Sequence, residues 1–163
     1  MAGRTLAEWE MELSSSHRIA RLRAVRTLPV FGKRAIPALT RSLKSADKAV
    51  VYWAAYGLGD LAQPNQLAIA SLRNVLNSKS EALRISAAYG LCRMGDLKKA
   101  LPVLTAALKS PHRGTANSAA DFLARIGPPA QSALPELKQA AKHPDYHVKN
   151  AANEAIRRIT TQK

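Results

Sequence analysis

Apolar residues in this chain recur in fixed columns, and the spacing of these columns limits what the chain can fold into. One column holds Leu28, Leu58, Leu91, Leu123 and Ile156, with steps of 30, 33, 32 and 33 residues. A second column holds Trp9, Leu39, Leu72, Leu104 and Leu137, and a third holds Ala24, Ala54, Ala87, Ala119 and Ala152. Units of this length are typical of repeat proteins, in which each unit packs on its neighbours.

Each unit predicts two helices joined by a short loop. In the second unit the apolar stripes at helical spacing are Ile36, Leu39 and Leu43, followed by Val50, Ala54, Leu58 and Leu61. The chain is rich in alanine and only 5% aromatic, which favours helices that pack at close range. We therefore predict an all-α, right-handed α-solenoid of about five helical hairpins, in a single domain over 1–163. The expected repeats cover about 5–32, 33–63, 64–96, 97–128 and 129–161.

Three kinds of residue mark the expected helix ends. Prolines are expected near the starts of first helices, where a missing N–H costs little: Pro37, Pro102 and Pro135. Glycines in a left-handed turn are expected after second helices: Gly32, Gly95 and Gly127. The residues expected to cap the N-termini of second helices are Asp47, Ser80 and Asp145.

A longer motif carries a family resemblance. The run A-L-R-I-S-A-A-Y-G-L at 82–91 fits the pattern x-(V/L)-(R/K)-x-x-A-A-x-x-L. With this motif and the columns, residues 5–161 resemble the HEAT-like repeats of bacterial proteins, of the type first grouped with phycobilin lyases. The resemblance implies that second helices line the concave side of the solenoid. Because members of this family are mostly binding scaffolds, it also implies a binding function.

A partial Asp–Arg ladder accompanies the resemblance. HEAT units of this family often hold an Asp at the turn and an Arg in the second helix, bonded between neighbouring repeats. The Arg positions here read Arg21, Val51, Arg84, Ala116 and Lys149. We predict that Asp47 pairs with Arg21 or Arg84, its neighbours in the adjacent repeats.

A narrower resemblance covers one nonapeptide. The run V-V-Y-W-A-A-Y-G-L at 50–58 is similar to a run in HEAT-like modules at the C-termini of some bacterial sulfatases, with Val51 in place of the usual Arg. The chain has no C/S-x-P-x-R nucleophile motif, so it lacks the sulfatase chemistry itself. An accessory C-terminal module of a larger enzyme such as a sulfatase is therefore one alternative function.

The charge balance points to acidic partners. Lys and Arg number 25 against 11 acidic residues, which gives a net charge of +14. Such a balance favours nucleic acid, other polyanions or acidic protein faces. No apolar leader or membrane span is present, and a single cysteine forms no intrachain disulfide, so we expect a cytoplasmic protein.

No constellation of residues predicts catalysis, a metal or a cofactor. No His-Glu dipeptide occurs, although HEAT-like di-iron hydroxylases hold iron with such pairs. His143 and His147 are separated by a turn, and Cys92 has no expected acid or base partner. We predict a non-enzymatic protein without cofactor or metal. HEAT-like DNA glycosylases stay open, because their site is a concave cleft with few motif residues.

The aromatic run at 49–59 supplies a candidate binding surface. At 100° per residue, Tyr56 points away from the partner helix of its own repeat, and Tyr52 lies on the same outward side. Trp53 lies on the flank, where we expect the next repeat's second helix to pack. The equivalent columns give a predicted set of partner contacts on the concave face: Leu22, Tyr52, Tyr56, Ile85 and Tyr89.

Two binding functions follow from these columns. The preferred hypothesis is a scaffold that binds a protein or peptide partner on the concave face, since exposed Tyr and Arg with apolar residues are typical of protein-binding hot spots. The alternative is a basic module for nucleic acid or another polyanion, with predicted anion contacts at Arg23, Arg26, Arg93, Arg125 and Arg158. Asp121 and Glu154 would interrupt a continuous basic groove.

Overall fold

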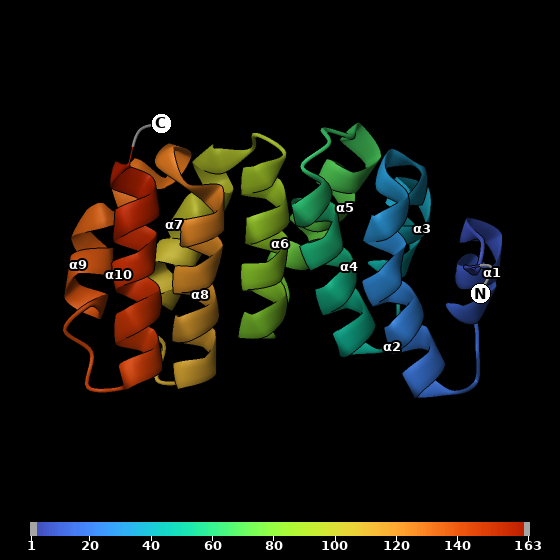
Figure 1. Cartoon of the computed structure of the whole chain (residues 1–163), viewed down its shortest axis with the longest axis horizontal. Coiled ribbons are helices and arrows are strands. Elements are labelled where there is room, and N and C mark those ends of the chain that lie inside the picture. Colours follow the sequence, from blue (N-terminus) through green and yellow to red (C-terminus); the bar gives the residue numbers. More distant parts are fainter. Residues whose placement is uncertain (1–2, 162–163) are drawn as a thin grey trace.

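The computed structural model describes residues 3–161, and within them it contains helices and no strand. The α-helices are α1 (Leu6–Glu12), α2 (Arg18–Thr27), α3 (Ile36–Ser42), α4 (Lys48–Leu61), α5 (Gln66–Leu76), α6 (Glu81–Arg93), α7 (Leu97–Ala107), α8 (Arg113–Ile126), α9 (Leu134–Ala140) and α10 (Tyr146–Thr160). Two 3-10 segments, η1 (Leu28–Ala35) and η2 (Pro128–Ala133), precede α3 and α9. Successive helices pair as antiparallel hairpins along one axis (Figure 1).

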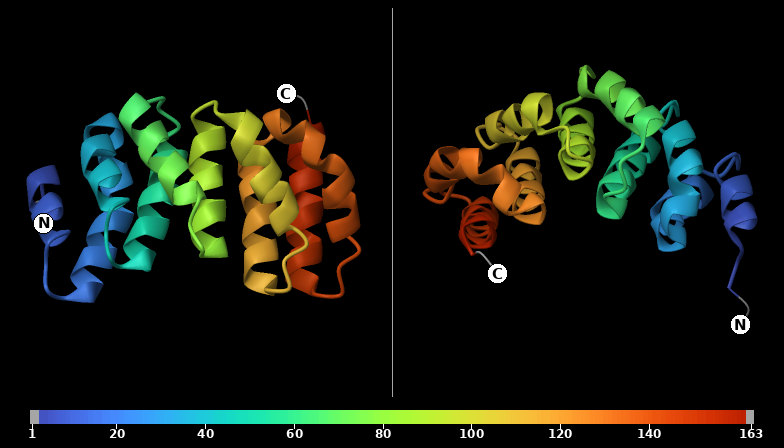
Figure 2. Two further views of the ribbon diagram at one scale, coloured as in Figure 1. Left: turned by 180° about the vertical axis from the view of Figure 1, so that it is seen from behind. Right: turned by 90° about the horizontal axis from the view of Figure 1, so that it is seen from above.

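The hairpins form an arc, so the predicted α-solenoid is confirmed. Seen from above, the first helices of the pairs lie on the outer side, and α2, α4, α6, α8 and α10 lie on the inner side (Figure 2, right). The concave surface is therefore built from second helices. Whether residues 1–163 form one domain with the expected repeat boundaries stays a prediction.

The predicted columns form the core. The alanine column is fully buried in all five units, which lets neighbouring second helices approach closely. Leucines of the other two columns are also fully buried, for example Leu28, Leu58, Leu104 and Leu137. The exceptions lie at the two ends of the solenoid, where Trp9 and Ile156 are only partly buried.

The loop inside each hairpin repeats one hydrogen bond. A side chain accepts from the backbone N–H two residues later, at 3.0–3.2 Å, in all five loops. The accepting residues are Ser15, Ser45, Ser78, Ser110 and His143. This turn orients each second helix in the same way, because it fixes the backbone at the residue that begins the helix.

All three predicted N-cap residues lie at the N-cap positions of their helices. Asp47 accepts from the N–H of Ala49, and Asp145 accepts from two N–H groups of α10. Ser80 has the extended backbone of an N-cap, but its hydroxyl makes no capping hydrogen bond. A serine side chain is shorter and uncharged, and α6 instead has an acidic residue in its first turn, Glu81.

The predicted positive φ of the three glycines is confirmed, although Gly32 lies inside η1 and not directly after α2, and the proline predictions hold in two cases of three. Gly32, Gly95 and Gly127 have φ of 59°, 93° and 70°. Pro37 and Pro135 lie in the first turns of α3 and α9. Pro102 lies inside α7, because that helix begins earlier than expected, at Leu97.

The predicted ladder contact is confirmed, with an additional partner. Asp47 lies 3.6 Å from the Arg21 guanidinium and 2.8 Å from that of Arg18, both in the preceding hairpin. The Arg18 hydrogen bond is the main cause that lowers the pKa of Asp47. Arg84 instead donates to the carbonyls of Ser78 and Lys79 in its own loop, at 3.0 and 3.1 Å. Arg21 donates to the equivalent carbonyls of the first hairpin, those of Ser15 and Ser16. The arginine at this position of the second helix therefore stabilises the loop of its own hairpin.

Candidate functional site

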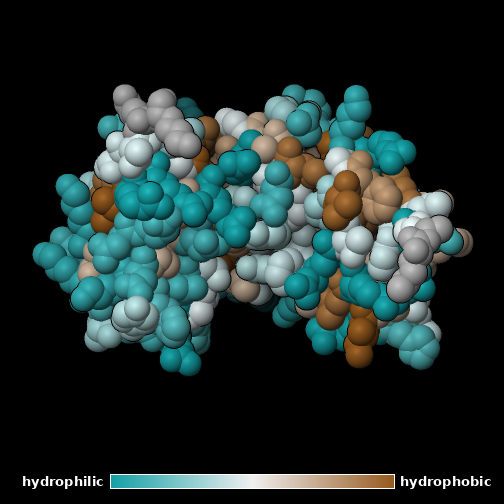
Figure 3. Space-filling view, viewed as in Figure 1, coloured by the Kyte–Doolittle hydropathy of each residue, from teal (hydrophilic) through white to brown (hydrophobic). Residues whose placement is uncertain are grey.

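The concave face divides into regions of different character. Figure 3 looks onto this face, and hydrophilic residues dominate it over α8 and α10. Hydrophobic residues gather on the opposite half, over α2 and its surroundings. A binding surface for apolar side chains is therefore expected in the N-terminal and central part.

Five aromatic side chains from three helices meet at the centre of this face. Tyr52, Trp53 and Tyr56 of α4 form two edge-to-face contacts, with ring centroids 5.4 and 5.5 Å apart. Tyr56 also lies 5.6 Å from Tyr89 of α6 and 5.9 Å from Phe122 of α8. Tyr89 and Phe122 stack at 4.6 Å. This aromatic cluster joins three successive hairpins.

The absence of a side chain at Gly59 makes room for the cluster. A Cβ placed there would lie 2.6 Å from a ring carbon of Tyr89 and 3.2 Å from the backbone of Gly90. A Cβ on Gly90 would in turn lie 3.0 Å from the carbonyl oxygen of Ala55. Both glycines therefore let α4 and α6 approach closely, and the Tyr89 ring fills the remaining space.

A polar network closes the upper edge of the cluster. The Tyr89 hydroxyl donates to Asp60 at 2.7 Å, and burial, more than this hydrogen bond, raises the pKa of Tyr89. Arg125 lies 2.9 Å from Asp121 and 3.7 Å from Asp60. Arg93 donates to backbone carbonyls near the C-termini of α4 and α8, at 3.3 and 2.8 Å. Guanidinium groups at these helix ends offset the partial negative charge of the last carbonyls.

The placement of two predicted partner contacts is wrong. Ile85 and Tyr89 are each only 1% exposed, so neither offers a surface to a partner. The reason is the curvature of the arc, because Tyr56 reaches past α6 to Phe122 of α8 and covers the inner side of α6. Leu22, Tyr52 and Tyr56 are half-buried and pack against the core with one side. Their role in binding stays a prediction.

Tyr56 and Trp53 both have packing partners. Tyr56 contacts four rings or guanidinium groups, including that of Arg125 at 5.5 Å, so it has a structural role as well as an accessible edge. Trp53 does lie at a joint between hairpins, but against the preceding one: the Arg26 guanidinium of α2 lies 4.6 Å above its ring. The expected packing of Trp53 against the following hairpin stays a prediction.

Three of the five predicted anion contacts are already engaged within the chain. Arg93 binds carbonyl groups, Arg125 pairs with Asp60 and Asp121, and Arg158 pairs with Glu154. Hydrogen bonds from Arg157 and Arg158 lower the pKa of Glu154 to about 2. The expected interruption of a basic groove by Asp121 and Glu154 is therefore seen, because these carboxylates offset the charge of Arg125 and Arg158.

Arg23 and Arg26 differ from these three arginines. Arg23 lies 5.7 Å above the Trp9 ring and Arg26 lies 4.6 Å above the Trp53 ring. Within residues 3–161 neither forms an ion pair with a carboxylate. Stacking on an indole holds a guanidinium flat while its N–H edge stays available.

Sequence reasoning missed an apolar depression beside these arginines. It has a volume of about 500 Å³ and is lined by Ile19, Leu22, Arg23, Arg26 and Thr27, all from α2. Ile19 is 80% exposed, which is unusual for so large an aliphatic side chain. The sequence did carry a signal, since the equivalent positions of the other units hold smaller or polar residues: Ala49, Ala82, Gly114 and His147.

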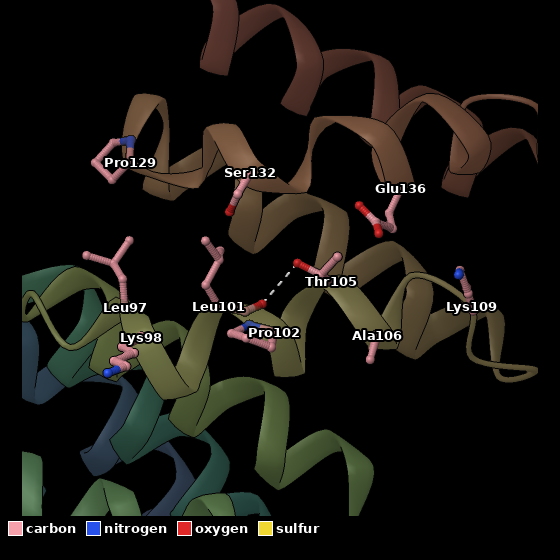
Figure 4. A pocket seen from close by; sticks show the side chains of 10 residues that line it. All are labelled: Leu97, Lys98, Leu101, Pro102, Thr105, Ala106, Lys109, Pro129, Ser132 and Glu136. Carbon is pink, nitrogen blue, oxygen red and sulfur yellow. Dashed lines mark hydrogen bonds between the residues drawn. The ribbon is translucent and has the colours of Figure 1, made fainter.

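A groove on the outer side has a larger volume, about 660 Å³. It lies between α7 and the η2–α9 segment, and Figure 4 shows Leu97, Leu101 and Pro129 at one end and Lys109 and Glu136 at the other. Its lining mixes apolar side chains with both signs of charge, so its composition selects no particular class of ligand.

The thiol of Cys92 is buried and has no features of a catalytic nucleophile. Burial raises the pKa of Cys92 to about 12, so the thiol is neutral near pH 7 and a poor nucleophile. Among residues 3–161 no three His, Cys, Asp or Glu side chains are grouped as metal ligands would be. No helix in the same range is both long and apolar enough to cross a membrane.

Comparison with known proteins agrees with this architecture. The sequence pattern described as HEAT repeats matches residues 69–157, which is more than half of the chain. The chain belongs to the HEAT-repeat family. No curated protein sequence gives a significant match. The narrower resemblance to sulfatase modules is not shown by any of these matches and stays a prediction.

Solved structures of several repeat proteins share the fold. The complex of CpcE and CpcF of phycocyanin lyase from Nostoc sp. PCC7120 matches with a TM-score of 0.68 and 25% identity, covering 99% of this chain and 67% of that chain. A designed armadillo repeat protein in complex with the peptide (KR)4 matches with a TM-score of 0.58 and 17% identity, over 95% of this chain and 82% of that one. An engineered protein matches with a TM-score of 0.60 and 21% identity, covering 96% of this chain and 80% of that chain.

Proposed function

We propose that this chain is a non-enzymatic HEAT-repeat scaffold that binds a protein or peptide partner on its concave face. The observation that carries the proposal is the concave strip, which we define as the half-buried side chains Tyr52 and Tyr56 of α4 together with Leu22 of the preceding second helix, α2. Tyrosine supplies a large contact area at low entropic cost, and a hydroxyl that can still reach water or a partner.

The surrounding chemistry favours binding over catalysis. The carboxylates near the aromatic strip, Asp60 and Asp121, are already engaged by Tyr89 and Arg125 within the chain. The similar Nostoc structure is named as part of a lyase, and it is also a complex of two proteins. The designed armadillo protein is named with a bound peptide. Both names support a scaffold that holds a second chain.

The other functions considered from sequence receive less support. A polyanion site along the arginine column would need Arg93, Arg125 and Arg158 free, and each already has a partner. A module of a sulfatase rests on residues 50–58 alone. A cytoplasmic location rests on the sequence composition. We retain these as predictions without a structural observation in their favour.

Selection from a random peptide library on phage, followed by titration calorimetry with the synthesised peptide, tests the proposal. Tyr52→Ala should raise the Kd of the selected peptide by about tenfold, the usual effect of truncating a hot-spot aromatic. Tyr146→Ala is the matched control, because Tyr146 is 70% exposed at the start of α10 and outside the aromatic strip. Equal Kd values for the two variants would refute a concave-face site at the strip.

A further inference from the structure

One face of α2 is left uncovered at the N-terminal end of the solenoid. Elsewhere each second helix packs against the next along the arc (Figure 2). Within residues 3–161 the one helix before α2 is α1, which has seven residues and no buried side chain. As a result Ile19 stays 80% exposed, and the depression of about 500 Å³ is lined by α2 alone.

The register of the repeats shows what this face is shaped to receive. Arg23 and Thr27 are equivalent to Trp53 and Gly57 of α4. Those two positions face the preceding hairpin: Trp53 lies beneath Arg26, and a Cβ on Gly57 would lie 2.8 Å from the Pro29 side chain. The uncovered face of α2 therefore has the position and shape of a helix-packing surface without its helix.

Its charge restricts the occupant. Arg23 and Arg26 are each held over an indole ring and make no ion pair within residues 3–161, beside the aliphatic side chains of Ile19 and Leu22. Guanidinium groups fixed in this way favour carboxylates, which they bind with two parallel hydrogen bonds. Aliphatic contacts flanked by carboxylates describe one face of an acidic amphipathic helix.

A second copy of this chain does not fit the same surface. Two copies joined through α2 would place Arg23 and Arg26 opposite their own counterparts. Head-to-tail stacking would use the exposed face of α10, where Lys149, Asn153 and Arg157 occupy the positions that face the following hairpin in α4. Both arrangements bring cations together, and the one carboxylate beside this face of α10, Glu154, is already paired with Arg157 and Arg158, which opposes association.

We propose that the N-terminal end of the solenoid binds an acidic amphipathic helix of a different protein, with aliphatic side chains at Ile19 and Leu22 and carboxylates at Arg23 and Arg26. This surface shares Leu22 with the concave strip, but it does not depend on Tyr52 or Tyr56. The bound helix continues the row of second helices by one position. The partner therefore extends the solenoid at its end.

The chain carries its own reporter for this site. Its two tryptophans, Trp9 and Trp53, are the residues beneath Arg23 and Arg26. The probe is a synthetic helix of about 15 residues with Leu on one face and Glu at its borders, long enough to be marginally helical alone. Its matched control has Lys in place of every Glu. Binding of the acidic probe should change tryptophan emission, and the Lys probe should leave it unchanged.

Variants locate the site. Arg23→Met with Arg26→Met, and separately Ile19→Asp, should each raise the Kd of the acidic probe by about tenfold or more. Lys33→Met with Arg34→Met removes the same charge from exposed positions of η1 and should leave the Kd unchanged. Circular dichroism checks that every variant stays helical.

Three results would overturn the inference: no binding of the acidic probe, equal binding of the Lys probe, or equal Kd for the two double variants. A concentration-dependent dimer that Ile19→Asp abolishes would also overturn it, in favour of a second copy. None of these results bears on the concave strip, because the Tyr52→Ala test uses a different surface and a different peptide.

Discussion

Replacing Gly59 by alanine is expected to destabilise the protein, although alanine is the better helix former. Gly59 lies inside α4, where the exchange on its own would stabilise the helix by about 1 kcal/mol. The new Cβ, however, would lie 2.6 and 2.7 Å from two ring carbons of Tyr89. That ring cannot move freely, because it stacks on Phe122 and donates to Asp60.

The expected magnitude follows from these opposing terms. Overpacking a filled core costs about 1–3 kcal/mol, and the displaced hydroxyl loses a hydrogen bond worth about 1 kcal/mol. After subtraction of the gain in helix propensity, Gly59→Ala should lower the free energy of unfolding by about 1–3 kcal/mol. In thermal unfolding this corresponds to a Tm lower by roughly 2–12 °C for a chain of this size.

A second glycine in a helix supplies the control. Gly114 lies in the first turn of α8, and a Cβ there would meet nothing within 4 Å. Gly114→Ala should therefore stabilise the protein, by about 0.5 kcal/mol. Urea unfolding followed by circular dichroism measures both variants. If Gly59→Ala is as stable as Gly114→Ala, the close packing of the Tyr89 ring against Gly59 of α4 is refuted.

Three further predictions concern the polar contacts and the buried thiol. Arg84→Ala removes two hydrogen bonds to loop carbonyls and should cost about 1–2 kcal/mol in urea unfolding; an unchanged midpoint would contradict this role. Tyr89→Phe keeps the stacked ring but loses the hydrogen bond to Asp60, so it should cost about 1 kcal/mol and leave the helical content unchanged. The pKa of Cys92 is raised by burial to about 12, so the unfolded thiol ionises first and the free energy of unfolding should fall as pH rises above about 9. Cys92→Ala should flatten that fall, and identical slopes for the two proteins would exclude the thiol as its cause.

Much of the fold follows from the sequence because it depends on local periodicity. The three columns predicted helices, their pairing and their buried faces, and the alanine column is fully buried in every unit. The turn at each hairpin could also have been predicted, since four loops place a serine two residues before the cap position. The first residue of a helix was predicted less well: α7 begins at Leu97, ahead of the position expected from Pro102. Where a helix begins depends on the whole turn before its first apolar position.

The candidate site was predicted less well, because exposure depends on how closely helices approach. The repeat positions of the sequence assign a face to each helix separately, and they place Ile85 and Tyr89 on the face of α6 that points toward the concave side. In the structure α4 and α6 approach through Gly59 and Gly90, and Tyr56 then covers the inner side of α6. Glycines inside two predicted helices were the available signal, since an interior glycine often marks a close contact between backbones.

The net charge of +14 gave the least information about the site, and the reason is its distribution. Eleven acidic residues are too few to balance the cations overall, yet those on the concave face lie where they offset the arginines of that face, as Asp121 and Glu154 do. Total charge therefore overstates the potential of the groove. What distinguishes Arg23 and Arg26 is that each stacks on an aromatic ring with no carboxylate paired to it, which no composition could reveal. A partner with carboxylates next to aliphatic side chains would meet both features at one place on α2, whereas a polyanion would meet opposing carboxylates along most of the face.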